Sequence, residues 1–160
     1  MKMSGGVEWG LHCCVVLTVS EEPVPAARLA ELHDVSSSYL AKQLQALSRA
    51  GIIHSVQGKA GGYVLTRPPQ DLTVLDVVQA VDGPGPAFVC TEIRQRGPLA
   101  APPAACTAPC AIARAMAAAE DAWRSALAGV TIADLAQDVT ADYETPVMAG
   151  IRDWLATPAS

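Results

Sequence analysis

The sequence predicts a mainly α-helical fold with a small β-hairpin, arranged as a winged helix-turn-helix followed by a long helix. Two observations carry this prediction. Residues 25–65 show two helical patterns separated by a short turn, and then two strand patterns around a glycine-rich turn. After Pro109, apolar residues recur at helical intervals over more than two heptads. The chain has 160 residues, of which 51% are hydrophobic, so one domain with a modest core is expected.

The first helix is expected to begin at Ser4, a good N-cap, and to run to about Ser20. Its inner face consists of residues at three- and four-residue steps: Val7, Leu11, Cys14 and Thr18. Cys14 is therefore expected in the core, whereas Cys13 is ambiguous. Glu8 and His12 lie one turn apart on another face, so their side chains could converge on one ion. The alternative is an exposed Glu-His pair that stabilises the helix slightly.

The next two helices are predicted from their caps and their apolar spacing. Pro25 suits the first turn of a short helix over residues 26–32, and residues 33–34 form the turn that follows. Ser36 can cap the second helix of the pair. The apolar residues of this second helix form one buried stripe: Leu40, Leu44 and Leu47.

The opposite face of this second helix is polar and cationic. It carries Ser37, Ser38, Lys42, Gln45 and Arg49. Short hydrogen-bonding groups and cations of this kind contact base edges and phosphates in a DNA major groove. A helix pair with a merely solvated polar face is the alternative, and the predicted wing argues against it.

The predicted wing follows directly. Gly51 ends the second helix, and strands are expected over residues 52–56 and 63–66. The turn between them is glycine-rich, which lets a backbone approach a phosphate or a groove wall closely. Residues 35–70 hold four cations and no acidic residue, although the net charge of the chain is −5. Attraction to phosphate is therefore expected to be local, and DNA affinity should fall with salt.

A structural helix over residues 73–81 is predicted next, with Thr73 and Asp76 as a capping box. Residues 83–109 then form a proline-rich loop without sustained periodicity. Three cysteines lie in this loop or directly after it: Cys90, Cys106 and Cys110. Long loops in compact domains are usually functional or disordered, and three thiols favour a site. Their spacing does not match the paired CxxC knuckles of a zinc ribbon.

Pro109 is placed to start a long helix over residues 110–128. Its apolar residues form a coiled-coil-like seam: Ile112, Met116, Ala119, Trp123 and Leu127. A dimer seam is favoured over an intramolecular core helix, because the preceding domain has enough helices to close its own core. Thr131 and Asp134 form a second capping box at a short helix. Residues 146–155 are expected to add a final amphipathic turn or two.

The apolar run over residues 13–19 is too short to span a bilayer, and no signal peptide is visible. The protein is therefore expected to be cytoplasmic and not membrane-bound. In a reducing compartment its five cysteines are expected to be thiols, metal ligands or redox sensors rather than structural disulfides.

Several short motifs together resemble one family of bacterial regulators. They are Ser38-Tyr39-Leu40, Ala50-Gly51-Ile52, Ser55-Val56-Gln57-Gly58 and Gly61-Gly62-Tyr63-Val64-Leu65. From about Lys2 to Leu135 the chain is similar to the IscR and NsrR class of the Rrf2 family, which are winged-helix transcriptional regulators. Three further stretches resemble the redox-sensing members that carry a 2Fe-2S cluster: Gly5-Gly6-Val7-Glu8-Trp9, His12-Cys13-Cys14 and Cys90-Thr91-Glu92-Ile93-Arg94.

The candidate DNA-binding residues lie on the second helix of the pair and on the wing. They are Ser36, Ser38, Tyr39, Lys42, Gln57 and Lys59. Many members of the family carry an arginine at the position of Gln57 and an acidic residue at that of Ala41. The resemblance therefore implies a shifted preference for the operator sequence.

In cluster-bearing members a carboxylate near the start of the first helix can reach the cluster of the partner subunit, and Glu8 stands at that position. A 2Fe-2S cluster needs four ligands. The resemblance implies that Glu8 and His12 of one subunit bind one iron, while two of the three loop cysteines of its partner bind the other. Trp9, beside Glu8, would be displaced when the ligands move and would act as a redox relay. The alternative is that Trp9 is an ordinary packing residue.

The expected function is thus a redox- or nitrosative-stress-responsive transcriptional repressor, a homodimer that binds double-stranded operator DNA. One alternative is a cluster-free regulator that senses by cysteine oxidation or binds zinc. Another is a small iron-sulfur or thiol oxidoreductase, but neither a CxxC motif nor a nucleotide-binding glycine loop is found, so no enzyme is expected. The expected regions are a winged helix-turn-helix (1–83), a cluster-binding loop (84–109), a dimerisation helix region (110–136) and a C-terminal extension (137–160).

Overall fold

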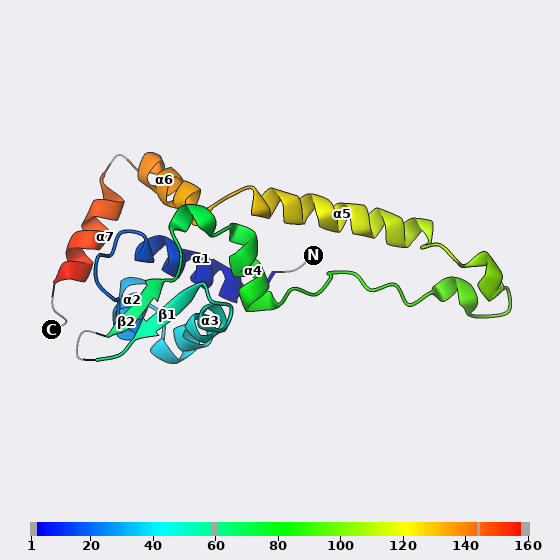
Figure 1. The fold of residues 1–160 in the computed structure, drawn as a ribbon, viewed down its shortest axis with the longest axis horizontal. Helices are drawn as coiled ribbons and strands as arrows, with labels where there is room; N and C mark the ends of the chain where they lie inside the picture. The colour runs from blue at the N-terminus through cyan, green and yellow to red at the C-terminus, as the bar shows by residue number, and fades with distance from the viewer. Residues whose placement is uncertain (1–2, 59–60, 144, 158–160) are drawn as a thin grey trace. The chain divides into compact units, whose positions relative to one another are not determined.

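The computed structural model (Figure 1) contains a helix-turn-helix pair and a two-stranded antiparallel hairpin, which confirms the predicted fold class. The structure describes residues 3–58, 61–143 and 145–157. By its internal contacts the chain divides into a unit of residues 85–126 and a larger unit made of the other described residues. None of the described helices is long and apolar enough to cross a membrane.

The larger unit begins with four helices whose apolar faces share one core. They are α1 (Gly5–Leu17), α2 (Ala26–Leu32), α3 (Ser37–Arg49) and α4 (Val74–Asp82). The predicted stripe of leucines on α3 is completely buried. Ser36 caps this helix as predicted, because its Oγ accepts a hydrogen bond from the Tyr39 backbone N–H at 3.3 Å. The helix-turn-helix is therefore specified by local caps together with apolar spacing.

The first helix departs from its prediction in two ways, and the structure places one residue that the sequence left ambiguous. It ends at Leu17 rather than near Ser20. Ser4 does not cap it with its side chain, since the Ser4 backbone N–H and Oγ both donate to the Asp82 carboxylate at the end of α4. Cys13 is as fully buried as Cys14, so both thiols belong to the core. Burial raises the pKa of Cys13 to about 12 and raises that of Cys14 as well.

The wing consists of β1 (Ile53–Val56) and β2 (Gly62–Leu65), paired so that Ile53 lies opposite Leu65. A short third segment adds to it, because Val24 and Tyr63 exchange two backbone hydrogen bonds of 3.0 and 2.8 Å. Gly51 has a φ of +70°, the left-handed conformation that glycine adopts freely after a helix end. Residues 59–60 of the predicted turn, including Lys59, lie outside the described residues.

The C-terminal part of the larger unit adds α6 (Ile132–Asp142) and α7 (Val147–Ala156). Both predicted capping boxes are present, at Thr73 on α4 and at Thr131 on α6. The N-terminal ends of α4 and α6 are also joined to each other, because the Ile132 N–H donates to the Leu72 carbonyl at 2.8 Å. Met148 of α7 is buried in the core that α1 and α3 share. The helices α6 and α7 are thus an integral layer of the larger unit (Figure 1).

Replacing Arg28 by alanine is expected to lower the free energy of unfolding by about 2 to 3 kcal/mol, as measured by urea denaturation. Arg28 is only 8% exposed, and its guanidinium lies 3.5 Å from the centre of the Trp154 ring. Its Nη2 donates to the Trp154 carbonyl at 2.7 Å, so it fastens α7 to α2. Arg152→Ala is the control, since that side chain is exposed and, among the described residues, pairs with its neighbour Asp153 alone. Equal losses in the two variants would contradict the prediction.

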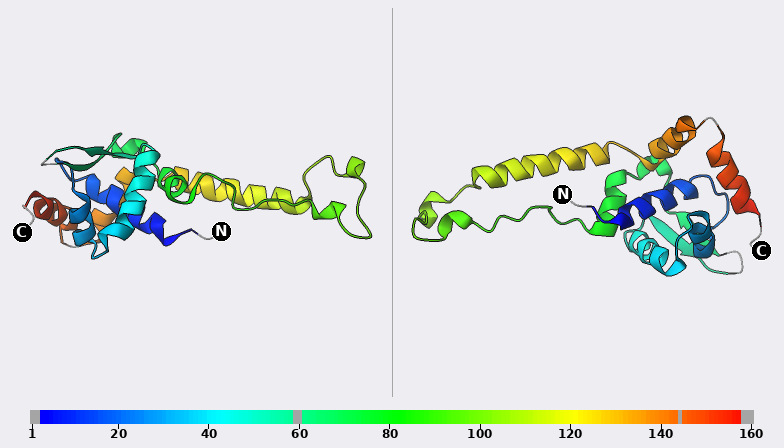
Figure 2. Two further views of the ribbon diagram at one scale, coloured as in Figure 1. Left: turned by 90° about the horizontal axis from the view of Figure 1, so that it is seen from below. Right: turned by 180° about the vertical axis from the view of Figure 1, so that it is seen from behind.

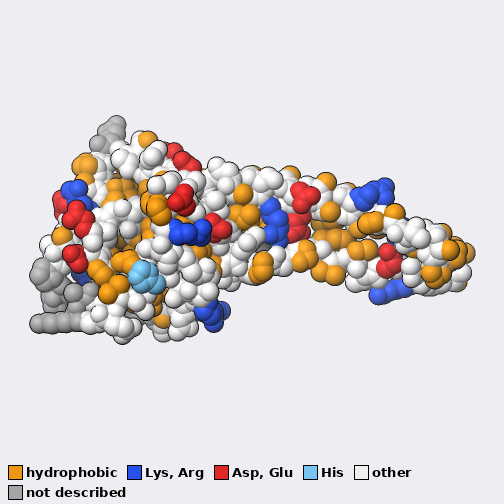
Figure 3. Space-filling model, in the orientation of Figure 1, with side chains coloured by type: hydrophobic (Ala, Val, Ile, Leu, Met, Phe, Trp, Pro, Cys, Tyr) orange, Lys and Arg blue, Asp and Glu red, His pale blue; other side chains and the backbone are white. Residues whose placement is uncertain are grey.

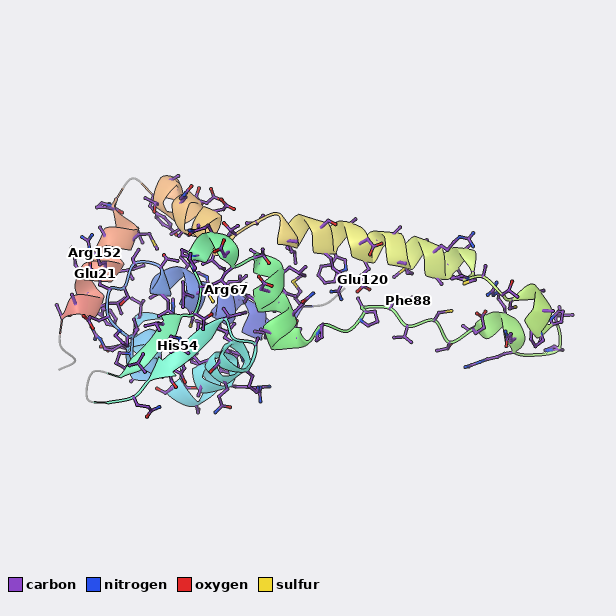
Figure 4. All side chains as sticks on the ribbon, in the orientation of Figure 1. Glu21, His54, Arg67, Phe88, Glu120 and Arg152 are labelled. Atoms are coloured by element: carbon purple, nitrogen blue, oxygen red, sulfur yellow. The ribbon has the colours of Figure 1, made fainter. Side chains whose placement is uncertain are left out.

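The smaller unit contains two short 3-10 helices, Ile93–Gln95 and Pro103–Ala105, and most of α5 (Ala111–Ala128). An extended segment runs along α5 (Figure 2), where the Ala87 N–H donates to Glu120 at 2.9 Å. Phe88 and Glu120 both lie between this segment and the helix (Figure 4). No residue of α5 is buried, and Ile112 of the predicted seam is 68% exposed. A dimer seam on α5 therefore stays a prediction.

Candidate metal centre and nucleic-acid interface

The polar face of α3 is open to solvent. Among the candidate DNA-binding residues, Ser36, Ser38, Lys42 and Gln57 are exposed and Tyr39 is 41% exposed. Lys59 lies outside the described residues. The helix α3 itself contains no Asp or Glu, and on the face shown in Figure 3 no acidic side chain lies over it. The helix that would enter a DNA groove therefore presents cations and hydroxyls without competing carboxylates.

The hairpin beside α3 adds a side chain that the sequence did not single out. His54 of β1 is exposed and lies on the outer face of the strand (Figure 4). The strand residue after it, Ser55, is exposed too. Both belong to the wing that carries Gln57, and a hydroxyl or an imidazole can donate a hydrogen bond to phosphate. The signal that could have found them was the polar face of a predicted strand.

Glu8 and His12 lie on α1 with exposed side chains. Neither makes a hydrogen bond or an ion pair with another described residue. They stand one helical turn apart, so a carboxylate oxygen and an imidazole nitrogen are presented on the same side of the helix. This arrangement is open to a ligand.

Trp9 lies in a cluster of rings that connects three elements of the helix-turn-helix unit. Its indole lies 6.0 Å from the ring of His33 and 6.4 Å from that of Tyr39, measured between centroids. The ring of His12 also lies 5.6 Å from that of His33. The cluster thus joins the candidate ligand helix α1, the turn after α2 and the first turn of α3.

His33 of this cluster was expected only as a turn residue. Its Nε2 is buried and makes no hydrogen bond to a described residue. Burial, followed by the nearby His12, lowers the pKa of the His33 imidazole. No periodicity or motif marks a histidine in this role, because its neighbours come from α1 and α3.

The cysteine loop brings thiols together at the start of α5. Cys110 immediately precedes this helix, and its Sγ accepts a hydrogen bond from the Ala113 N–H at 3.3 Å. That bond is the main cause that lowers the pKa of Cys110, with smaller contributions from the Cys90 side chain and the Arg94 guanidinium. Cys90 and Ala113 also line one cavity of about 260 Å³. Cys90 and Cys110 are therefore neighbours in the fold although twenty positions separate them in the sequence.

Cys106 lies elsewhere in the same loop. It follows the second 3-10 helix of the loop and lies near the Arg94 guanidinium. Among the residues that the structure describes, no three His, Cys, Asp or Glu side chains form a group that could hold a metal ion within one chain. The sequence left the choice among the three cysteines open, and the path of the loop favours Cys90 with Cys110.

Comparisons with known proteins place this geometry in a family. The model of the Rrf2 family, described as an iron-dependent transcriptional regulator, matches residues 3–138. The regulator IscR of Aliivibrio salmonicida is 40% identical over 76 residues, which are 48% of this chain and 45% of that protein. The matches span about half the length of such curated relatives, 58%, 55% and 45% in three of them.

Solved structures agree with this match. CymR, the global cysteine regulator of B. subtilis, has a TM-score of 0.64 at 27% identity and covers 86% of this chain and 97% of that one. IscR of T. potens has a TM-score of 0.66 and covers 93% of this chain and 96% of that one. Its identity of 23% supports the fold alone.

Proposed function

Because the chain belongs to the Rrf2 family of transcriptional regulators, we propose that it is a redox-responsive repressor that binds operator DNA as a homodimer in the cytoplasm. Membership of this family excludes the oxidoreductase alternative, since its members are regulators and not enzymes. The observation that carries the proposal is the ring cluster. Through Trp9 and His33 it joins the helix of Glu8 and His12 to the first turn of α3.

The donor set suits a 2Fe-2S cluster that is shared between two subunits. Glu8 and His12 of one subunit supply an exposed carboxylate and an exposed imidazole. Cys90 and Cys110 of its partner supply two neighbouring sulfurs, one of which is stabilised as a thiolate by the Ala113 N–H. When bound, the cluster would supply a one-electron centre whose potential is raised by nitrogen and oxygen ligation.

The chain's own residues account for how a change at the ligands would affect DNA binding. His12 packs against His33, and Trp9 packs against both His33 and Tyr39. Tyr39 lies in the first turn of α3, where the N-terminal residues of a recognition helix contact base edges. A rotation of His12 or Trp9 would therefore be transmitted to the position of Tyr39. Two such helices in a dimer require half-sites about one turn of DNA apart.

The proposal is tested by isolating the protein without oxygen and measuring its visible absorption before and after dithionite. A reversible 2Fe-2S spectrum is expected, and the changes Glu8→Ala, His12→Ala, Cys90→Ala and Cys110→Ala should each alter or abolish it. Glu21→Ala and Cys106→Ala serve as matched controls and should leave it intact. A colourless protein without iron would overturn the cluster, and an unchanged spectrum in the Glu8 and His12 variants would overturn this ligand set.

A second function is supported by the same thiol pair. Cys90 and Cys110 are close enough to interact without a metal, and Cys90 is exposed. A cluster-free regulator could therefore sense oxidants by joining these two sulfurs, or bind zinc. In that case the isolated protein would be colourless, and oxidation with diamide would change its DNA affinity in the parent chain but not in Cys90→Ala.

A further inference from the structure

Arg94 occupies the middle of the cysteine loop and links its two ends. Its Nε and Nη2 donate to the two carboxylate oxygens of Glu92 at 2.6 and 3.0 Å. The same Nη2 donates to the carbonyl of Ala108 at 2.9 Å. Glu92 lies two residues after Cys90, and Ala108 lies two residues before Cys110. One guanidinium therefore connects the chain segments that carry the two thiols.

Few other contacts hold these segments together. At the start of the loop the Ala87 N–H donates to Glu120, and Phe88 is half-buried against α5. Beyond these two contacts, no residue between 85 and 109 is buried, and Leu99 and Ile93 are 95% and 73% exposed. With so little apolar burial, keeping the ends of a long loop together costs conformational entropy that few other contacts offset. The half-buried residues of the loop are Phe88, Glu92, Arg94, Ala101 and Cys106. All of them except Phe88 lie around Arg94, which makes its surroundings the most protected part of the loop after Phe88.

The shape of the side chain matters for this link. A guanidinium can bind both oxygens of one carboxylate and still direct an N–H elsewhere, because its five donors have a fixed planar geometry. The single ammonium of lysine cannot reproduce that fork. The backbone supports the arrangement, since Glu92 adopts a left-handed φ of +52° and the Arg94 carbonyl accepts from the Ala101 N–H at 2.8 Å.

We propose that Arg94 is the positioning residue of the thiol pair, and that it keeps Cys90 and Cys110 side by side so that both can bind one ligand. The inference deepens the proposed function, on which it rests for the identity of that ligand as the cluster. A partly exposed Arg-Glu pair by itself contributes little to stability. The contribution of Arg94 comes from the third bond, to Ala108, which closes the loop.

The test uses phenylarsine oxide on the full-length, reduced, cluster-free protein carrying Cys106→Ala. The reagent forms two As–S bonds with a pair of nearby thiols and releases its oxygen as water, with no change in oxidation state. The parent chain should bind one arsenical across Cys90 and Cys110, detected by intact mass. Arg94→Gln and Arg94→Lys should each weaken this binding by about tenfold or more, because the second thiol loses its high effective concentration.

Arg96→Gln is the matched control, because Arg96 lies two residues away and its one side-chain hydrogen bond to a described residue goes to the Thr91 carbonyl, at 3.2 Å. It should bind the arsenical as the parent does. The thermal unfolding midpoint should be the same in all variants, since the loop lies outside the core of the larger unit. Arsenical binding in Arg94→Gln within twofold of the parent would overturn the proposal.

The same variants separate this inference from the cluster itself. If the parent protein takes up no iron but Arg94→Gln still loses arsenical binding, the positioning role of Arg94 is supported and the cluster proposal fails. The opposite result is that the parent carries a cluster and Arg94→Gln holds it with the same midpoint potential and loses iron to a chelator at the same rate. In that case the positioning role of Arg94 is overturned and the cluster proposal stands.

Discussion

Replacing Gly62 by alanine is expected to lower the free energy of unfolding by about 3 kcal/mol and to weaken DNA binding, because the wing can no longer close. A Cβ at Gly62 would overlap the carbonyl of Val24 and lie 2.7 Å from the nitrogen of Pro25. These neighbours are backbone atoms, so no side-chain rotation relieves the overlap. They are also fixed in place, since Val24 and Tyr63 exchange two backbone hydrogen bonds. Urea denaturation gives the stability, and fluorescence anisotropy with duplex DNA gives the affinity.

The control for this substitution is Gly150→Ala. Gly150 lies on the exposed side of α7, and an added Cβ meets no atom within 4 Å. Alanine is better than glycine in a helix by up to about 1 kcal/mol, so this variant should be slightly more stable than the parent. If Gly62→Ala were as stable as the parent, the close approach of Val24 to the hairpin would not be a feature of the protein in solution.

Elements that depend on residues close in the sequence were predicted correctly. Thr73 and Asp76, like Thr131 and Asp134, are three positions apart, and each pair forms the expected capping box. A capping box is a local exchange of hydrogen bonds between residues three positions apart, so it can be predicted from the sequence without knowledge of tertiary contacts. The buried stripe of α3 was predicted for the same reason, since helical periodicity alone places its leucines on one face.

The prediction that the structure corrects, and the one that the sequence left open, both depend on residues far away in the chain. Ser4 has the side chain of an N-cap, yet it donates to Asp82, which lies 78 positions later. Cys13 was ambiguous because the helix wheel gave α1 one inner face, whereas the surrounding elements cover more of it. Tertiary packing overrides local preference in both cases, and these tertiary contacts cannot be predicted from local sequence patterns.

The candidate site also has one part that local spacing predicts and another that depends on the tertiary structure. That Glu8 and His12 share one side of a helix follows from their spacing, and the exposure of both side chains agrees with it. The choice among three cysteines could not follow from spacing, because the loop between them has no regular structure and its path sets which sulfurs meet. Arg94 was quoted only as part of a family motif, and its bond to Ala108 across 14 positions is what reveals a structural role.

Changing Lys42 to glutamine is expected to raise the dissociation constant for duplex DNA by about 30-fold at 0.15 M salt. Lys42 is exposed on the polar face of α3. Each phosphate contact releases counterions, which contributes about fivefold in affinity at this ionic strength, and a dimer would lose two such contacts. The slope of log affinity against log salt should therefore fall by about two. Anisotropy titrations at several salt concentrations measure both quantities on a duplex that the protein has selected from a random pool.

Arg152→Gln removes the same charge from the exposed face of α7, where Arg152 pairs with Asp153, and it should leave affinity and slope nearly unchanged. Similar losses in the two variants would mean that net charge alone attracts DNA, and that α3 is not the reading helix. Gln57→Ala separates phosphate attraction from base readout, because a side chain that contacts base edges changes which duplex is preferred. Lys42→Gln should instead weaken selected and unselected duplexes by the same factor, since every sequence presents the same phosphates.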